Sequence, residues 1–177
     1  MSTHMRTVVP RDGRRRILLS TVSSDSHTWN LVFLQLLLEE MGNEVVNLGP
    51  CVPDQLLIDS VRRIRPDAVV ISTVNGHGCL DGARLIRALR ADAVAGATPV
   101  IIGGKLGITG GTGDQAAQEL VEAGFDAVFT DTADPSLVSR LLGSLPGGTP
   151  EAALSLPAER SAEARPEQHR ATEGRAL

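Results

Sequence analysis

An aspartate and a histidine lie two residues apart, at Asp25 and His27, in the stretch SSDSHTWN. This stretch separates two apolar segments, ILLSTV and LVFLQLLLEEMG, where a buried strand is expected to give way to a helix. Histidine is the commonest metal-ligating side chain, and a bound imidazole usually donates its other ring N–H to a carboxylate. Residues i and i+2 of an extended loop point to the same side, so Asp25 can orient the His27 ring.

A single histidine is a poor site for a bare zinc ion, which three or four protein ligands usually hold. The pair suits a metal whose other ligands come from a macrocycle. Taken alone, however, a loop histidine is more often a capping or surface residue. The remaining sequence has to decide between these interpretations.

Composition predicts one soluble globular domain. The chain has 177 residues, of which 42% are hydrophobic and 21% charged, and its formal net charge is -4. No apolar segment reaches the roughly 18–20 residues needed to span a bilayer. Two cysteines, Cys51 and Cys79, make no disulfide framework and favour a reducing cytoplasm. Mild acidity and an aromatic content of only 2% argue against nucleic-acid binding.

Apolar runs and helical patterns alternate along the chain between two polar ends. We expect disorder at 1–14 and 146–177, where the composition is polar or rich in Pro, Gly, Ala, Glu and Arg, and one folded domain over 15–145. Predicted strands lie at 15–22, 43–49, 67–73, 98–104 and 126–130, and predicted helices at 29–42, 52–67, 80–93, 113–125 and 134–145.

This alternation predicts an α/β fold with a doubly wound, five-stranded parallel sheet in the flavodoxin-like order 2-1-3-4-5. Ligands of such folds bind beyond the carboxyl ends of the strands, near the point where the strand order reverses. The loops that lie there are SSDSHTWN, STVNGHGCLD and GGKLGITGGTG. They are the candidate binding loops.

The usual ligands of this fold are each excluded by a particular residue pattern. The first strand–helix turn has no glycine, so it lacks the G-x-G-x-x-G of a dinucleotide site. In GGKLG the lysine comes too early for a phosphate-binding P-loop, and no hydroxyl residue follows it. A flavodoxin phosphate loop would have no central histidine. A phospho-receiver would need an aspartate at the end of the third strand, where Ser72 and Thr73 stand.

The stretch DSHTWN resembles the D-x-H-x-x-G motif of cobalamin-binding domains, whose histidine replaces the cofactor's own benzimidazole as lower cobalt ligand. That resemblance implies that His27 ligates cobalt and that Asp25 supports it. The family's S-x-L motif corresponds to Ser72-Thr73-Val74, and its G-G motif to Gly103-Gly104. The resemblance to cobalamin-binding domains extends from about Arg16 to Leu142. By the same resemblance, further cofactor contacts are expected from Ser24, Ser26, Thr28, Gly76, Lys105 and Thr132.

Within that family the chain most resembles small subunits of glutamate mutase, in the segments ISTVNGHGCLD and GFDAVFTDTADPS. The resemblance implies adenosylcobalamin as cofactor, a carbon-skeleton rearrangement of an amino acid, and a separate large barrel-type subunit that binds the substrate. No catalytic residue is then expected on this chain alone. The pattern differs at Asn30, which replaces the motif glycine, at Val74, which replaces leucine, and in the N-x-H-x-C loop at 75–79.

Two alternatives remain beside the mutase subunit. One is a corrinoid methyl carrier, or a cobalamin-binding module without mutase activity. Such carriers usually have a helical domain ahead of the cobalamin fold, and the few residues before Arg16 favour the mutase. The other is a degenerate member that binds something else, which Asn30 would favour. His77 is expected to face solvent or a partner, Cys79 to be a small residue at a helix start, and Lys105 to be a solvated cation unless it meets a phosphate or carboxylate.

Overall fold

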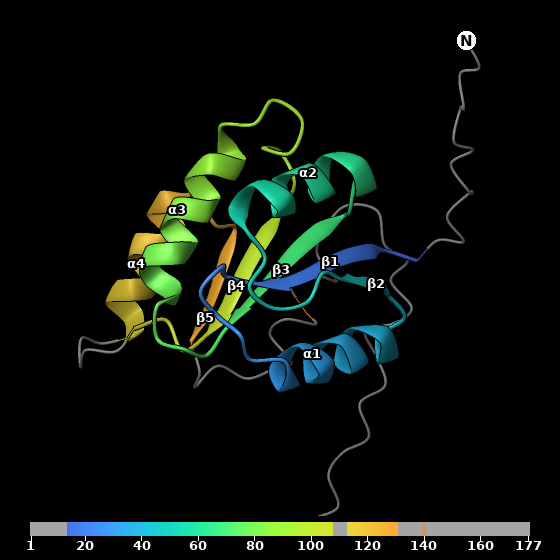
Figure 1. The fold of residues 1–177 in the computed structure, drawn as a ribbon, viewed down its shortest axis with the longest axis horizontal. Coiled ribbons are helices and arrows are strands. Elements are labelled where there is room, and N and C mark those ends of the chain that lie inside the picture. Colours follow the sequence, from blue (N-terminus) through green and yellow to red (C-terminus); the bar gives the residue numbers. More distant parts are fainter. Residues whose placement is uncertain (1–13, 108–112, 131–139, 141–177) are drawn as a thin grey trace, which may run out of the picture.

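Five parallel strands form one sheet in the order β2-β1-β3-β4-β5 in the computed structural model, which describes residues 14–107, 113–130 and 140 (Figure 1). The strands are β1 (Arg16–Thr21), β2 (Glu44–Asn47), β3 (Ala68–Thr73), β4 (Val100–Gly104) and β5 (Ala127–Thr130). The strand order and the parallel pairing confirm the predicted doubly wound fold.

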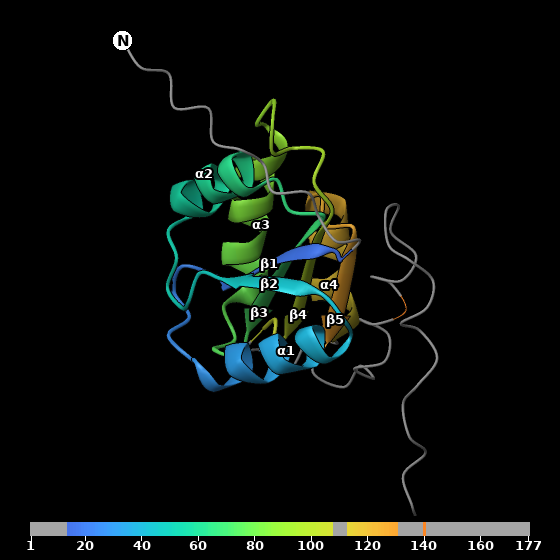
Figure 2. The same ribbon diagram turned by 90° about the vertical axis from the view of Figure 1, so that its right-hand side faces the viewer.

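Helices cover both faces of the sheet. They are α1 (Trp29–Glu40), α2 (Asp54–Ile64), α3 (Gly78–Arg90) and α4 (Gly113–Ala123). Figures 1 and 2 show α1 on one face and the other three helices on the opposite face. Each connection between neighbouring parallel strands thus passes through a helix, as parallel pairing requires.

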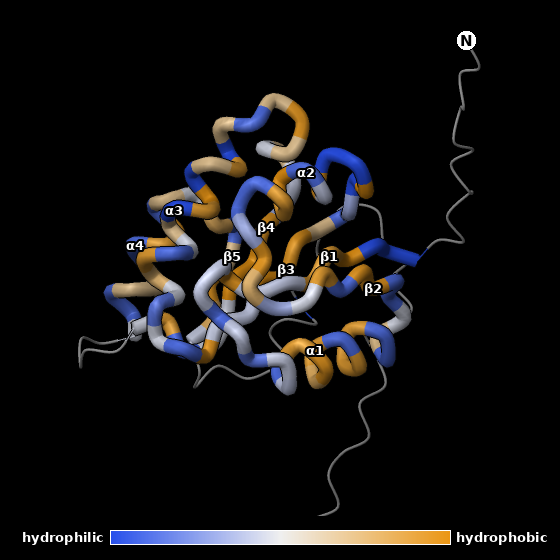
Figure 3. Tube along the Cα trace, viewed as in Figure 1, coloured by the Kyte–Doolittle hydropathy of each residue, from blue (hydrophilic) through white to orange (hydrophobic). Residues whose placement is uncertain are grey.

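The core has two layers, because successive side chains of a strand point to opposite faces of the sheet. Leu18 and Ile71 face α2, α3 and α4, whereas Ile17, Leu19 and Val70 face α1. Burial on both faces explains why the strands are continuous apolar runs without alternation. Figure 3 shows the central strands coloured as hydrophobic.

Glycine and proline set most of the helix ends. Gly42 follows α1 with φ +81°, and Gly124 follows α4 with φ +125°, a left-handed region that glycine enters readily. Pro53 precedes α2, which ends at Ile64, before Pro66 and three residues short of the predicted end at 67. Helix α3 begins at Gly78, two residues before the predicted start at Leu80. A Cβ atom at Gly78 would lie 2.4 Å from the Thr73 side chain, and the N–H of Cys79 donates to the Leu106 carbonyl oxygen at 2.8 Å, contacts that local pattern does not encode.

Several predictions concern residues that the structure does not describe. They are the N-terminal segment through residue 13, the helix at 134–145 apart from residue 140, the tail at 146–177 and the site residue Thr132. They stay predictions. Within the described ranges, no helix is long and apolar enough to cross a membrane.

The three candidate loops leave the sheet at its carboxyl edge. Neighbouring β1 and β3 carry the first two loops, and β4 carries the third beside β3. The register pairs Ser72 with Gly103 and Thr73 with Gly104, so the second and third sequence motifs lie side by side. The fold therefore brings together motifs that lie far apart in the sequence.

Candidate functional site

His27 and Asp25 form a hydrogen-bonded pair in the loop between β1 and α1. The Nδ1 atom of His27 lies 2.7 Å from Oδ1 of Asp25, and the same oxygen accepts the backbone N–H of His27 at 3.0 Å. A carboxylate can only accept a hydrogen bond, so it selects the tautomer that carries the proton on Nδ1. The lone pair of Nε2 is then free. The His27 side chain is 46% exposed, and Nε2 can therefore act as a ligand for a metal at the surface.

Asp25 is fully buried, although it is ionisable. Its second oxygen, Oδ2, accepts the backbone N–H groups of Val74 at 2.6 Å and Asn75 at 3.3 Å. Burial acts to raise the pKa of Asp25, but the hydrogen bonds from Val74 and His27 outweigh it and hold the pKa below its ordinary value. The carboxylate is thus ionised at neutral pH and locks the first loop to the second.

Further hydrogen bonds fix the backbone around Asp25. The hydroxyl of Thr21 donates to the carbonyl oxygen of Asp25 at 2.8 Å, and the N–H of Cys51 donates to the same oxygen at 3.0 Å. The N–H of Asp25 donates to the Val22 carbonyl oxygen at 3.0 Å. Asp25 is therefore held by its backbone as well as its side chain, which gives the His27 ring a rigid support.

The glycine pair at the end of β4 allows a close backbone approach. Gly104 has φ +116°, and a Cβ atom there would lie 2.0 Å from the carbonyl oxygen of Thr73. The next residue, Lys105, donates its backbone N–H to that same oxygen at 2.8 Å. Gly103 is less crowded, because a Cβ atom there would lie 3.3 Å from the Cβ atom of Phe129. The third motif thus requires a glycine at position 104, because the backbones of β3 and β4 approach each other closely there.

Asn30 occupies the position of the motif glycine and points into the protein. It is 5% exposed, and its Nδ2 donates a hydrogen bond to the Oγ of Ser72, which is 4% exposed. Among the described residues, the Asn30 Oδ1 atom has no hydrogen-bond partner. The substitution therefore does not simply add bulk, because its amide reaches the serine of the second motif.

A network of polar side chains lies beside Asp25, and the sequence did not predict it. Asn75 donates from Nδ2 to Ser24 Oγ at 3.0 Å, and Ser24 in turn donates to Asp81 on α3. Arg84 binds Asp81 at 2.5 Å and Asp54 at 2.7 Å. Burial acts to raise the pKa of Asp81, but the hydrogen bonds from Ser24 and Arg84 outweigh it and lower that pKa. Of these residues, the sequence pattern had indicated Ser24, as a cofactor contact, and Asn75, in the N-x-H-x-C loop at 75–79.

The other predicted site residues lie around this centre. Ser26, Thr28 and Lys105 are exposed, Val74 is half-buried, and Gly76 is buried with φ +83°. Thr73 is fully buried and its hydroxyl donates to Asn75 at 3.3 Å. His77 is exposed, and Lys105 carries the only lysine side chain in the sequence. The described part of the chain contains no group of three or more His, Cys, Asp or Glu residues that could hold a metal ion. A metal at His27 therefore has to bring most of its own ligands.

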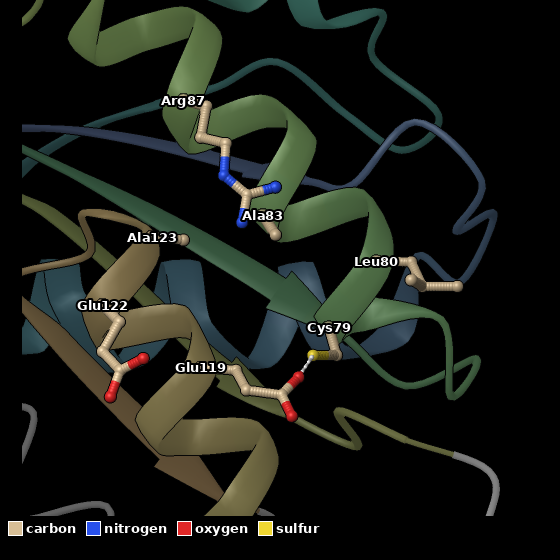
Figure 4. Close-up of a pocket in the computed structure, with 7 residues that line it drawn as sticks. All are labelled: Cys79, Leu80, Ala83, Arg87, Glu119, Glu122 and Ala123. Atoms are coloured by element: carbon tan, nitrogen blue, oxygen red, sulfur yellow. Dashed lines mark hydrogen bonds between the residues drawn. The ribbon is translucent and has the colours of Figure 1, made fainter.

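A hollow lies between α3 and α4, and His27 is not among the residues that line it (Figure 4). It has a volume of about 500 Å³ and contains Cys79, whose Sγ donates to Glu119 at 3.4 Å. Burial, followed by the Glu119 carboxylate, raises the pKa of Cys79. A thiol held in its neutral form is a weak nucleophile. This hollow is thus no candidate for thiol chemistry.

A family model described as the B12 binding domain matches residues 15–137. The chain belongs to the B12-binding domain family. The match covers β1 to β5 and includes all three loops at the carboxyl edge. The resemblance predicted from the three motifs is thereby confirmed at the level of the family.

Relatives of this B12-binding domain include glutamate mutase sigma subunits. That of Halobacterium salinarum is 32% identical over 114 residues, which are 64% of this chain and 75% of the relative. That of Fusobacterium nucleatum is 28% identical over 116 residues, or 66% of this chain and 85% of the relative. The chain is thus similar to glutamate mutase sigma subunits, at a modest sequence identity of 28% and 32%.

Solved structures give the same picture of the fold. A cobalamin-binding protein from Desulfitobacterium hafniense matches with a TM-score of 0.54 and 28% identity over 66% of this chain. The match covers 52% of that protein, so this B12-binding domain spans about half of its length. A receiver domain from Pseudomonas aeruginosa matches with a TM-score of 0.54 at 18% identity, covering 75% of this chain and 97% of the receiver. The latter likeness shows the fold alone.

Proposed function

We propose that this chain is the cobalamin-binding small subunit of an adenosylcobalamin-dependent carbon-skeleton mutase, similar to glutamate mutase. The observation that carries the proposal is the Asp25–His27 pair, which presents a free Nε2 atom at the carboxyl edge of the sheet. The names of the relatives support the mutase over a methyl carrier. No residue of this chain is proposed to react with the substrate.

The described residues fit a corrinoid. The single imidazole suits a cobalt ion whose equatorial ligands are supplied by the corrin ring. Ser72 and the glycines of β4 lie side by side at the carboxyl edge of the sheet and would hold the displaced nucleotide base of a bound corrinoid. Bound adenosylcobalamin would supply a cobalt–carbon bond that breaks homolytically and starts the radical rearrangement. The protein's own contribution is to ligate the cobalt through His27 and to orient that ring through Asp25.

A separate large subunit is part of the proposal, because this chain leaves His27 exposed at its surface. Radical chemistry has to exclude water, so another protein surface has to cover the upper face of the corrin. Helix α1 offers apolar surface beside the site: Trp29, Val32, Phe33 and Leu36 are all more than half exposed. Contiguous exposed apolar side chains are typical of protein–protein interfaces.

Reconstitution of activity tests the proposal. The chain is mixed with adenosylcobalamin, glutamate and the large subunit of a glutamate mutase, and the formation of 3-methylaspartate is followed. We expect product with the wild-type chain and none with His27→Ala. The variant His77→Ala, whose histidine lies in the next loop, is the control and should keep its activity. A chain that binds cobalamin but yields product with neither glutamate nor related amino acids would contradict the mutase assignment.

A further inference from the structure

The buried pair formed by Asn30 and Ser72 has hydrogen-bonding capacity left over. Asn30 donates to the Ser72 hydroxyl, and its Oδ1 atom has no partner in the part of the chain that the structure describes. Both side chains are at least 95% buried. A buried acceptor without a donor is unfavourable, and such a group in a binding region points to an absent donor.

An amide that is hydrogen-bonded to a hydroxyl always leaves at least one donor and one acceptor unused. If Asn30 Nδ2 donates to Ser72, the amide oxygen and the hydroxyl proton remain. If the amide is turned round, the N–H groups and the hydroxyl oxygen remain. The pair therefore presents a donor beside an acceptor in either orientation. The complementary ligand is a group whose edge carries an acceptor beside a donor.

The pair lies where the lower part of a corrinoid has to be held. Asn30 is in the first turn of α1, three residues after His27, and Ser72 is at the carboxyl end of β3. Gly103, the register partner of Ser72, adds no side chain there. When His27 takes the lower position on cobalt, the nucleotide base of the cofactor leaves the metal on that same side. A bound cobamide would then bring its base to the side of the carboxyl edge on which Asn30 and Ser72 lie.

We propose that Asn30 and Ser72 select cobamides whose lower base is an aminopurine, such as adenine, over those with dimethylbenzimidazole. This inference rests on the proposed cobalt ligation by His27. The amino group and the neighbouring N1 atom of adenine place a donor beside an acceptor, a pattern that an asparagine amide can meet with two hydrogen bonds. Dimethylbenzimidazole carries a ring-nitrogen acceptor but no hydrogen-bond donor, so it leaves the Asn30 Oδ1 atom without a partner. A glycine in place of Asn30 would make no such distinction.

Titration of the ligand-free chain with three corrinoids tests the inference. They are a cobamide with adenine as lower base, cobalamin, and cobinamide, which has no lower base. Binding is followed by the visible spectrum of the corrin. We expect the wild-type chain to bind the adenine cobamide at least about tenfold more tightly than cobalamin, since one well-formed polar pair separates them. Asn30→Gly should abolish or reverse that ratio and leave cobinamide affinity unchanged.

The outcomes separate this inference from the proposed function. Cobinamide binding that depends on His27, together with equal affinities for the two complete cobamides, would overturn base selection alone. A preference that persists in Asn30→Gly would also overturn it. The absence of any spectral change that depends on His27, with all three corrinoids, would overturn both proposals. If Asn30→Gly does not fold, Asn30→Ala takes its place. It should lose the preference for the adenine cobamide over cobalamin, and a preference equal to that of the wild type would overturn base selection.

Discussion

At the scale of single residues, the site depends on a carboxylate that never meets solvent. Asp25 is fully buried, and its carboxylate oxygens accept hydrogen bonds from His27 and from the loop after β3. A carboxylate in this position fixes the tautomer and the orientation of a metal-ligating imidazole. The metal affinity of His27 is therefore expected to depend on Asp25.

Asp25→Asn should weaken cobalamin binding by roughly 10- to 100-fold, the usual effect of removing a carboxylate that supports a metal-bound histidine. Spectroscopic titration measures the dissociation constant. Asp114→Asn, at an exposed position in the first turn of α4, is the matched control and should bind like the wild type. Equal affinities of wild type and Asp25→Asn would remove Asp25 from the supporting role.

The same residue predicts how stability depends on pH. Folding holds the pKa of Asp25 below its ordinary value of 3.8. The ionised side chain thus stabilises the folded chain fully above that value, and the contribution is lost as the pH falls through the lower, folded pKa. As the pH falls below the ordinary pKa of 3.8, the free energy of unfolding should fall more steeply for wild type than for Asp25→Asn. Parallel curves from denaturant unfolding would contradict this.

At the scale of elements, β3 and β4 approach each other through a glycine. Gly104→Ala would place a Cβ 2.0 Å from the Thr73 carbonyl oxygen at a φ of +116°. We expect it to lower the free energy of unfolding by about 1–3 kcal/mol or more, from backbone strain and displacement of β3. Gly107→Ala is the control, because a Cβ there meets nothing within 4 Å, and should change stability by less than about 0.5 kcal/mol. Similar unfolding curves for both variants would show that the close approach is not required.

Helix α1 is apolar on its outer face as well as on the face that packs against the sheet. If the large subunit covers this surface, Phe33→Glu should weaken its association by roughly tenfold or more, because a charge replaces a buried aromatic ring. Sedimentation or surface plasmon resonance measures the association. Leu56→Glu, an exposed apolar position on α2 across the sheet, is the control and should leave association unchanged. Cobalamin titration confirms that both variants keep the site, and equal association of the two would exclude α1 from the interface.

At the scale of the whole molecule, the sequence predicted what local pattern determines. Apolar runs, together with Gly42, Pro53 and Gly124 at helix boundaries, sufficed for the described elements and the strand order. The Asp25–His27 contact was also predictable, because both residues lie in one short loop. The structure differs where partners are distant in sequence. Asn30 meets Ser72 42 positions away, and no local pattern encodes such a contact.

The most direct test of the account is whether His27 itself ligates the cobalt. The chain is prepared with ¹⁵N-labelled histidine, loaded with cob(II)alamin, and studied by electron paramagnetic resonance. We expect the nitrogen splitting of each cobalt line to change from a triplet to a doublet on labelling, because ¹⁵N has half the nuclear spin of ¹⁴N. His77→Ala should keep the doublet, and His27→Ala should lose it. A triplet that persists in the labelled wild-type protein would mean that the cofactor's own base remains on the metal, and would contradict the central claim.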